Sequence, residues 1–242
     1  MESTRGKLLV AAPSLADPNF RLTVLLMLEH GAEGALGVVL NRPSELTVKG
    51  AIDEWDAAVS EPRVVFVGGP VSQSSVIALA SVALDDADDH WSQVVGRIGT
   101  IDLEKNPGDI GGLDQVRIFA GYAAWAPGQL EGELEENAWF VLEHDGSDPF
   151  AEAPEELWWE VMARQDGELN RLRLYPRNPT DNSPDAYPLG LWGLILSMIC
   201  WISPLITPTT QLEPVRLRCT PSCWRTSTGL PSGSSGDGTA SR

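Results

Sequence analysis

Cysteine is missing from most of this chain. The three that occur, Cys200, Cys219 and Cys223, all lie beyond residue 182. The first 182 residues therefore contain neither a disulfide nor a thiol nucleophile. Basic residues are also scarce in this body, where 13 Lys and Arg stand against 31 Asp and Glu. An acidic surface repels phosphate backbones and anionic lipid head groups, so we expect no direct binding to nucleic acid.

Residues 183–242 have a different composition. This tail contains no lysine, and its four Arg nearly balance three Asp and Glu. An uncharged apolar run at 189–206 reaches the length of a membrane helix, about 17–25 residues. The flanking charges would, however, place the acidic body outside the cell. Two interpretations stay open, a membrane anchor and a non-cognate or disordered extension from read-through or an out-of-frame sequence. The composition favours the second, so membrane attachment is not expected.

A secretion signal is not expected either. The apolar run Leu8 to Ala12 is shorter than the h-region of a signal peptide, about 7–15 residues, and ends at Pro13. Charged residues follow soon after it, at Asp17 and Arg21. We therefore predict a cytoplasmic location for residues 1–182, which we expect to form one domain.

Apolar runs of strand length recur along the body. Leu8–Ala12, Thr23–His30 and Ala35–Asn41 are nearly continuously apolar, which predicts buried strands, and the glycine-rich turn Gly31–Gly34 joins the last two into a hairpin. Further strands are predicted at Arg63–Val71, Ser75–Val82, Gly96–Leu103, Gln115–Trp125, Ala138–His144 and Leu169–Pro176. Helices are predicted at Leu46–Trp55, Pro127–Asn137 and Ala153–Gln165. Strands in hairpin-like succession with interspersed helices predict an α+β fold with a mostly antiparallel sheet.

Four sequence blocks give the body a family resemblance. GKLLVAAPSLADPNFRLTVLLMLEH, GALGVVLNRP, VVFVGGPV and FAGYAAWAPGQLEGE follow one another between Gly6 and Asn182. Together they resemble the YqgE/AlgH family of bacterial proteins, whose members usually end near the YPRNP stretch. The resemblance implies an α+β domain with a bent or split sheet decorated with helices. Members are often labelled transcriptional regulators because one affects alginate production, and the family offers no catalytic residues to carry over.

The triplet Asn41-Arg42-Pro43, at the end of the predicted hairpin, is the main candidate site. Pro43 holds Arg42 in extended backbone, and the forked guanidinium suits a carboxylate or a phosphate. Residues 1–49 carry five basic and five acidic residues, so this region would not repel an anion. A structural ion pair between Arg42 and an acid is the equal alternative.

Gly68 and Gly69 extend this candidate site. They follow a predicted strand, where successive backbone N–H groups can form an anion-binding concavity, although a tight turn explains them equally well. Asn41 would orient the ligand through its amide, and the glycine loop would close over the same anion if the two segments are neighbours.

Histidine and glutamine supply the remaining candidates. His30 ends an apolar strand in a Leu-Glu-His sequence that recurs at Leu142–His144, but the spacing gives no metal motif, and we predict no metal site. Gln129, in the last family block, is a further ligand-binding candidate. Glu131 and Glu133 point to different faces of the predicted helix, so they make a poor acid–base pair and are expected to solvate an outer face.

Two classes of function remain. The first is a non-catalytic binding or regulatory module that recognises a small anionic ligand or a protein partner and uses no cofactor. The alternative is an enzyme whose site combines Arg42, His30 and the Gly68-Gly69 loop. Turnover of a bound ligand would distinguish the enzyme from the binding module.

Overall fold

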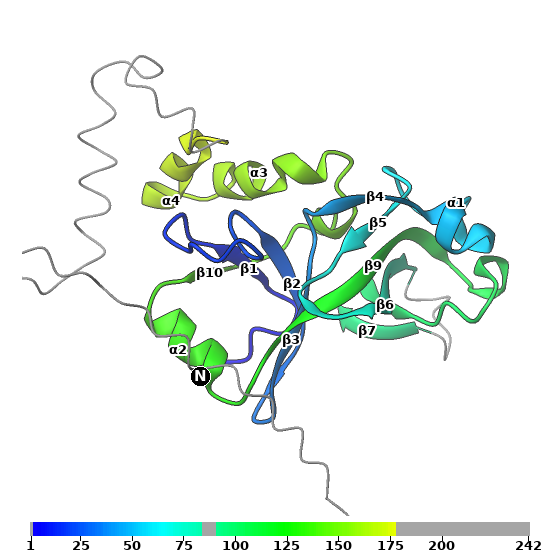
Figure 1. Ribbon diagram of the computed structural model, residues 1–242, viewed down its shortest axis with the longest axis horizontal. Coiled ribbons are helices and arrows are strands. Elements are labelled where there is room, and N and C mark those ends of the chain that lie inside the picture. The colour runs from blue at the N-terminus through cyan, green and yellow to red at the C-terminus, as the bar shows by residue number, and fades with distance from the viewer. Residues whose placement is uncertain (1, 84–90, 178–242) are drawn as a thin grey trace, which may run out of the picture. The chain divides into compact units, whose positions relative to one another are not determined.

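The computed structural model describes residues 2–83 and 91–177, all within the compact unit Met1–Asn182 (Figure 1). Its strands are β1 (Leu8–Ala11), β2 (Val24–Gly31), β3 (Gly34–Val39), β4 (Pro43–Thr47), β5 (Val64–Val67), β6 (Val71–Val82), β7 (Trp91–Val95), β8 (Ile98–Ile101), β9 (Leu113–Trp125) and β10 (Trp139–Leu142). Its α-helices are α1 (Val48–Ala51), α2 (Gln129–Glu135), α3 (Leu157–Ala163) and α4 (Gly167–Arg171). Short 3-10 helices are η1 (Asp53–Trp55), η3 (Pro107–Asp109), η4 (Asp148–Phe150), η5 (Pro154–Glu156) and η6 (Leu172–Leu174).

The strands form one curled sheet in the order β10-β1-β2-β3-β9-β6-β8-β7. Every step along this path is antiparallel. Strand β9 crosses the middle of the molecule and pairs with β3 at one end and with β6 along much of its length (Figure 1). Strands β4 and β5 lie off the path, and β5 runs parallel to β9. The predicted α+β class with a mostly antiparallel, bent sheet is confirmed.

Arg5 ties the two parts of the curl together. Its Nε donates to Leu28 O of β2 (3.0 Å), and its Nη2 donates to Gln93 O of β7 (2.6 Å). Gly6 lies so close to Val95, in the same strand β7, that an added Cβ would be 2.8 Å from the valine Cβ. A strand at the end of the sheet order therefore returns to β2, which is why the sheet is curled and not flat.

Strands β1 to β3 are buried on both faces. One face packs against α3, whose Trp158 and Met162 are fully buried, and the other packs against Leu130 of α2. Figure 1 shows α3 and α2 on opposite sides of these strands. The first five residues of β2 are all buried, as the continuous apolar run predicted. Each large apolar side chain buried in this way contributes about 1.5–3 kcal/mol, which makes the hairpin a rigid base for residues at its ends.

The predicted last strand, Leu169–Pro176, is wrong, because this segment forms α4 and η6. Leu169 and Leu172 are three residues apart, a spacing that suits a helical turn as well as alternation suits a strand. Leu172 and Tyr175 pack on the cluster that contains α3, and Trp159 donates its indole N–H to Tyr175 O (2.8 Å). Packing against α3 therefore accompanies the helical conformation.

The predicted helix Leu46–Trp55 is confirmed only in part. Its helical residues are divided between α1 and η1, while the preceding residues form β4, which pairs with β5. The predicted tail, including 189–206, lies outside the described residues. None of the helices in the described ranges has both the length and the apolar character needed to cross a membrane.

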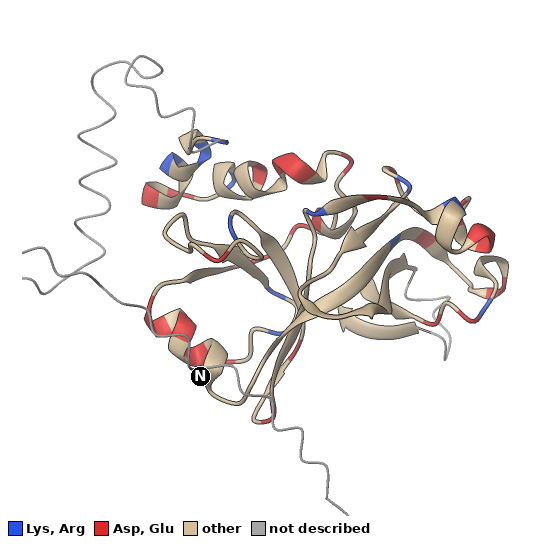
Figure 2. Ribbon diagram, in the orientation of Figure 1, with Lys and Arg blue, Asp and Glu red and all other residues tan. Residues whose placement is uncertain are grey.

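Charge follows this architecture. Figure 2 shows acidic residues on helices α2, α3 and α4, whereas the central strands carry few charges. Most arginines with acidic partners lie in this outer layer. The ion pairs are Arg63–Glu61, Arg97–Asp114, Arg164–Asp148, Arg171–Glu168 and Arg177–Glu156. These are five of the ten arginines in the described residues, and the other five form no ion pair with a described carboxylate.

Candidate functional site

Asn41 follows the β2–β3 hairpin and holds the segment that connects β1 to β2. The residue is 7% exposed; its side-chain amide accepts from Val24 N (3.0 Å) and donates to Leu22 O (2.9 Å). Leu22 has a positive φ of 53°, a left-handed conformation that costs a leucine about 1–3 kcal/mol. Asn41 therefore stabilises a strained connection, and both ends of its amide are already bonded, which leaves the predicted ligand-orienting role without support.

Arg42 bonds to the same connection but keeps part of its guanidinium free. Its Nη2 donates to Arg21 O (3.0 Å) and, more weakly, to Pro18 O (3.4 Å). Its Nε and Nη1 make no hydrogen bond to any described residue, and none of the described carboxylates forms an ion pair with it. The structural ion pair considered from the sequence is thus not seen, and half of the guanidinium fork is available.

Arg21 is the residue that the structure adds to the site. It lies at the end of the β1–β2 connection, and its Nη2 is buried without a hydrogen-bond partner among residues 2–83 and 91–177. The nearest acid in the sequence, Asp17, accepts from Asn19 N (2.8 Å) and forms no ion pair with Arg21 among the described residues. A buried donor without an acceptor costs about 1–3 kcal/mol, and more when it is charged. Among the described residues this buried nitrogen therefore stays an unsatisfied donor.

The two guanidinium groups act on each other. Burial first, and then the neighbouring charge of Arg21, lowers the pKa of Arg42 from its ordinary value. In contrast, Arg164 binds Asp148 through two hydrogen bonds (2.7 and 2.8 Å), and these bonds raise the pKa of Arg164. An oxyanion between Arg21 and Arg42 would relieve the repulsion between the two positive charges. It would also accept hydrogen bonds from their unpaired N–H groups.

Gly68 and Gly69 lie near Arg42, as the hypothesis required, but Gly68 has a different role. Val67 N donates to Arg42 O (2.8 Å), so β5 is a direct neighbour of the hairpin end. The N–H of Gly68 donates to Ala120 O (2.9 Å) and is not available to an anion. A Cβ on either glycine would collide with the backbone of β9. These glycines permit the close approach of β5 and β9, because any side chain at either position would occupy the space between the two strands.

His30 lies at the opposite end of the hairpin. Its Nδ1 accepts from Thr4 N (3.0 Å), so Nε2 carries the proton and donates to Glu131 Oε1 (3.0 Å). This hydrogen bond is the main cause that lowers the pKa of Glu131. Strand β2 separates His30 from Arg21 by its length, roughly 20 Å at 3.3 Å per residue. The structure therefore does not bring His30 and Arg42 into one catalytic site.

Gln129 belongs to a network around α2. Its Oε1 accepts from Ala126 N (3.1 Å), and its Nε2 donates to Glu133 Oε1 (3.0 Å). Glu133 Oε2 also accepts the indole N–H groups of Trp125 (2.9 Å) and Trp139 (2.8 Å). The prediction that Glu131 and Glu133 merely solvate an outer face is wrong, because each holds a partner from another element.

Metal-binding geometry is not found in the described ranges, where no group of three or more His, Cys, Asp or Glu side chains comes together. The second Leu-Glu-His sequence does not meet the first. Its Glu143 lies beyond β10 and pairs with Lys7 Nζ (3.3 Å). The arginine pair is thus the arrangement with the clearest chemical use.

Sequence reasoning found Arg42 but missed Arg21. The DPNF stretch ahead of Arg21 was expected to form a turn, and Arg21 is the first basic residue after it. No local pattern indicates that this turn returns to the far end of the hairpin, because the contact joins residues that are 21 positions apart. The balanced charge of residues 1–49 indicates this region as an anion site, but it does not indicate that Arg21 and Arg42 are neighbours.

Comparisons with known proteins agree with this fold. The family model described as DUF179, AlgH-like, matches residues 8–170. A UPF0301 protein of Streptomyces avermitilis is 47% identical over 187 residues, which cover 75% of this chain and 97% of that protein. A UPF0301 protein of Thermobifida fusca is 42% identical over 190 residues, covering 74% and 96%. The names of these relatives state no substrate or reaction.

Two solved structures share the fold. A crystal structure of a Corynebacterium diphtheriae protein is 34% identical, with a TM-score of 0.68, and the match covers 72% of this chain and 94% of that one. The solution structure of AlgH from Pseudomonas aeruginosa is 29% identical, with a TM-score of 0.53, covering 72% and 95%. Neither structure's description names a ligand.

Proposed function

The chain belongs to the AlgH-like family, and we propose that its domain is a non-catalytic recognition module that binds a small anion between Arg21 and Arg42. One observation carries the proposal. A buried guanidinium nitrogen of Arg21 has no acceptor, and the charge of Arg42 lies beside it, in a body with 13 basic and 31 acidic residues. Where acids are so abundant, two arginines without a carboxylate partner favour a ligand that supplies the negative charge.

The surroundings of the arginine pair favour binding over turnover. Proton transfer requires a general base within hydrogen-bond reach of the ligand. His30 is at the other end of β2, and the hydroxyl of Thr23 donates to Phe20 O (2.7 Å). The groups that reach the proposed anion are guanidinium N–H donors, which can hold a charge but cannot accept a proton.

The oxygens of a phosphate or a carboxylate would fit this pair equally in principle. Arg42 offers Nε and Nη1, and Arg21 adds a nearby positive charge whose buried Nη2 reaches a ligand only when its side chain turns, so the ligand needs at least two oxygens that diverge from one centre. A tetrahedral dianion also balances both positive charges. We therefore propose phosphate or a phosphate monoester as the preferred class, with carboxylates weaker.

Isothermal titration of residues 1–242 with inorganic phosphate, phenyl phosphate and succinate tests the proposal. We expect one phosphate site in the wild type and a loss of roughly 10–100-fold in affinity for Arg21→Ala and Arg42→Ala, since each removes a charge-assisted hydrogen bond. Arg42→Lys should bind phosphate almost as weakly as Arg42→Ala does, because lysine keeps the positive charge but lacks the forked guanidinium. Arg97→Ala is the matched control, as it removes an exposed arginine paired with Asp114.

Two results would contradict this function. Either no anion binds the wild type, or Arg97→Ala weakens binding as much as Arg21→Ala does. Release of phosphate from phenyl phosphate, lost in Arg42→Ala, would instead support the enzyme alternative.

A further inference from the structure

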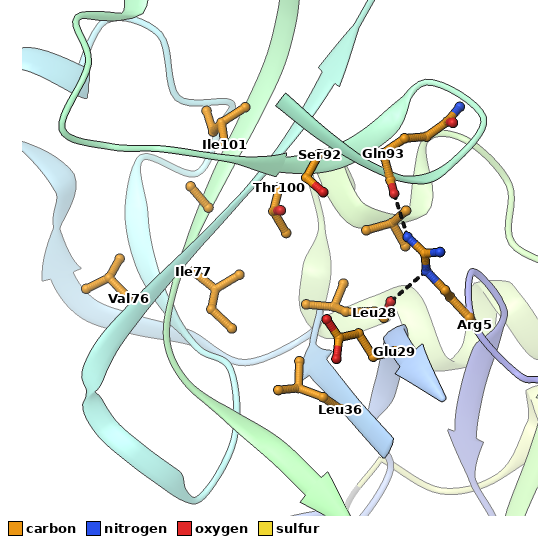
Figure 3. Close-up of a pocket in the computed structure, with 12 residues that line it drawn as sticks. Arg5, Leu28, Glu29, Leu36, Val76, Ile77, Ser92, Gln93, Thr100 and Ile101 are labelled. Atoms are coloured by element: carbon orange, nitrogen blue, oxygen red, sulfur yellow. Dashed lines mark hydrogen bonds between the residues drawn. The ribbon is translucent and has the colours of Figure 1, made fainter. Parts of the chain in front are cut away.

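A pocket of about 290 Å³ lies inside the curl of the sheet, at the end of the hairpin opposite the arginine pair. Residues from β2, β3, β6, β7 and β8 line it (Figure 3). Its lining mixes apolar side chains with polar ones, which are Arg5, Glu29, Ser92, Gln93 and Thr100. The volume is near the lower limit for pockets that bind small molecules, about 300–1,000 Å³.

A β-bulge directs Glu29 to this pocket. Met27 pairs with Gly37, but the next pair in the ladder is Glu29 with Leu36, so Leu28 is an extra residue in β2. In regular alternation, residue 29 would share the face of Met27, which packs in the core cluster beside α2. The bulge instead puts Glu29 on the face of Leu36, which lines the pocket.

The carboxylate of Glu29 has no partner within the described part of the chain, neither a hydrogen-bond donor nor a basic residue in ion-pair range. Arg5 also lines the pocket, but its Nε and Nη2 donate to backbone carbonyl oxygens of Leu28 and Gln93. Figure 3 shows one of these bonds ending at the Leu28 carbonyl oxygen, next to Glu29, and the other at the Gln93 carbonyl oxygen. Glu29 is exposed to solvent, so its carboxylate is accessible to a ligand that enters this open pocket.

The walls define the rest of the ligand. Leu28, Leu36 and Ile77 give apolar walls, while Glu29 lies on the β2 side and the hydroxyls of Ser92 and Thr100 lie on β7 and β8 (Figure 3). A ligand that spans this pocket needs a cation at one end, a short aliphatic chain, and a hydrogen-bonding group at the other end.

We propose that this pocket binds a small aliphatic amine, with its ammonium group on Glu29 and its far end at Ser92 and Thr100. A divalent metal fits less well, since one carboxylate and two hydroxyls provide fewer oxygen ligands than such ions take, about six to eight for calcium. The pocket and the arginine pair lie at opposite ends of the hairpin, so this inference does not depend on the proposed anion site.

NMR titration of the full chain with aminopentanol tests the assignment, with pentanediol and hydroxypentanoate as probes of the same length and different charge. Aminopentanol should shift the amide signals of β2, β7 and β8, pentanediol should bind more weakly, and hydroxypentanoate should not bind. Glu29→Gln should weaken aminopentanol by at least about tenfold, the loss expected for one charge-assisted hydrogen bond.

Glu33→Gln is the matched control, because it removes the same charge from the exposed turn between β2 and β3, outside the lining of the pocket. It should bind aminopentanol like the wild type. Equal weakening by Glu29→Gln and Glu33→Gln, or shifts spread over the acidic helices, would show general attraction to the surface and overturn the proposal. Absence of any shift with aminopentanol would overturn it too.

Discussion

The two ends of the β2–β3 hairpin carry polar residues that resemble each other in the sequence and differ in the structure. At one end, His30 bonds to Thr4 and Glu131 through both ring nitrogens. At the other end, Arg21 has a buried nitrogen without an acceptor, beside the half-free guanidinium of Arg42. A polar residue after an apolar strand is therefore structural or available according to whether the fold supplies its partners.

Arg117 shows that an arginine without a carboxylate partner is not, for that reason alone, available to a ligand. This arginine of β9 is 0% exposed and has no acidic partner, yet its Nη1 and Nη2 donate to Ala151 O (3.0 Å) and Glu61 O (2.7 Å). Its guanidinium lies over the ring of Phe66 (4.4 Å), and burial lowers the pKa of Arg117 to about 10. Backbone oxygens replace the acid for Nη1 and Nη2, while the buried Nε has no partner among the described residues, and the side chain is out of reach of a ligand.

The largest effect should come from Arg117→Ala. This change opens a cavity in the core and leaves two carbonyl groups without donors, so we expect a loss of about 3–5 kcal/mol in the free energy of unfolding. For a domain of this size that loss lowers Tm by about 6–20 °C. Thermal unfolding followed by circular dichroism measures it, and a Tm near that of the wild type would mean that Arg117 is not structural.

Asn41→Ala should come next. It removes two buried hydrogen bonds and frees the strained connection at Leu22, which predicts a loss of about 2–3 kcal/mol and of roughly 4–12 °C in Tm. Asn41→Asp is the control, because it keeps the acceptor for Val24 N and loses the donor to Leu22 O. If Asn41→Ala lost anion affinity with an unchanged Tm, Asn41 would be a ligand residue after all.

Glu131→Gln tests the hydrogen bond at the His30 end of the hairpin through the pH dependence of stability. The pKa of Glu131 is lowered in the folded protein, so its stabilising contribution is present above the unfolded pKa, about 4.3, and is lost as pH falls through the folded value. The difference in Tm between wild type and Glu131→Gln should therefore be full at pH 6 and shrink below about pH 4. A difference that stays constant down to pH 3 would contradict the hydrogen bond with His30.

The smallest effect on stability is expected from Arg21→Ala. Since its guanidinium has a buried nitrogen without an acceptor and lies near another positive charge, its removal should change Tm by less than about 2 °C, or raise it slightly. Arg42→Ala should cost slightly more, about 0.5–1.5 kcal/mol, because it loses bonds to two carbonyl groups. A large fall in Tm for Arg21→Ala, measured without added anions, would make the arginine pair structural.

Some of this could be predicted from short segments. The buried strands β1 to β3 follow from continuous apolar runs, and the turn at Gly31–Gly34 follows from its glycines. Where two patterns fit one segment, prediction failed. Leucines at 169, 172 and 174 suit a strand by alternation and a helix by their three-residue spacing, and packing against α3 selected the helix.

The sequence by itself thus determined the hairpin, the acidic charge of the body and the presence of Arg42 at a strand end, because these depend on residues that are neighbours in the chain. Only the tertiary structure decided which polar groups find partners within the protein and which are left for a ligand. It placed Arg21 beside Arg42, gave His30 two partners, and turned Glu29 into the pocket through one extra residue in β2. Hydrogen-bond partners come from distant segments, and a single bulge reverses the face of a strand, so neither is contained in local periodicity.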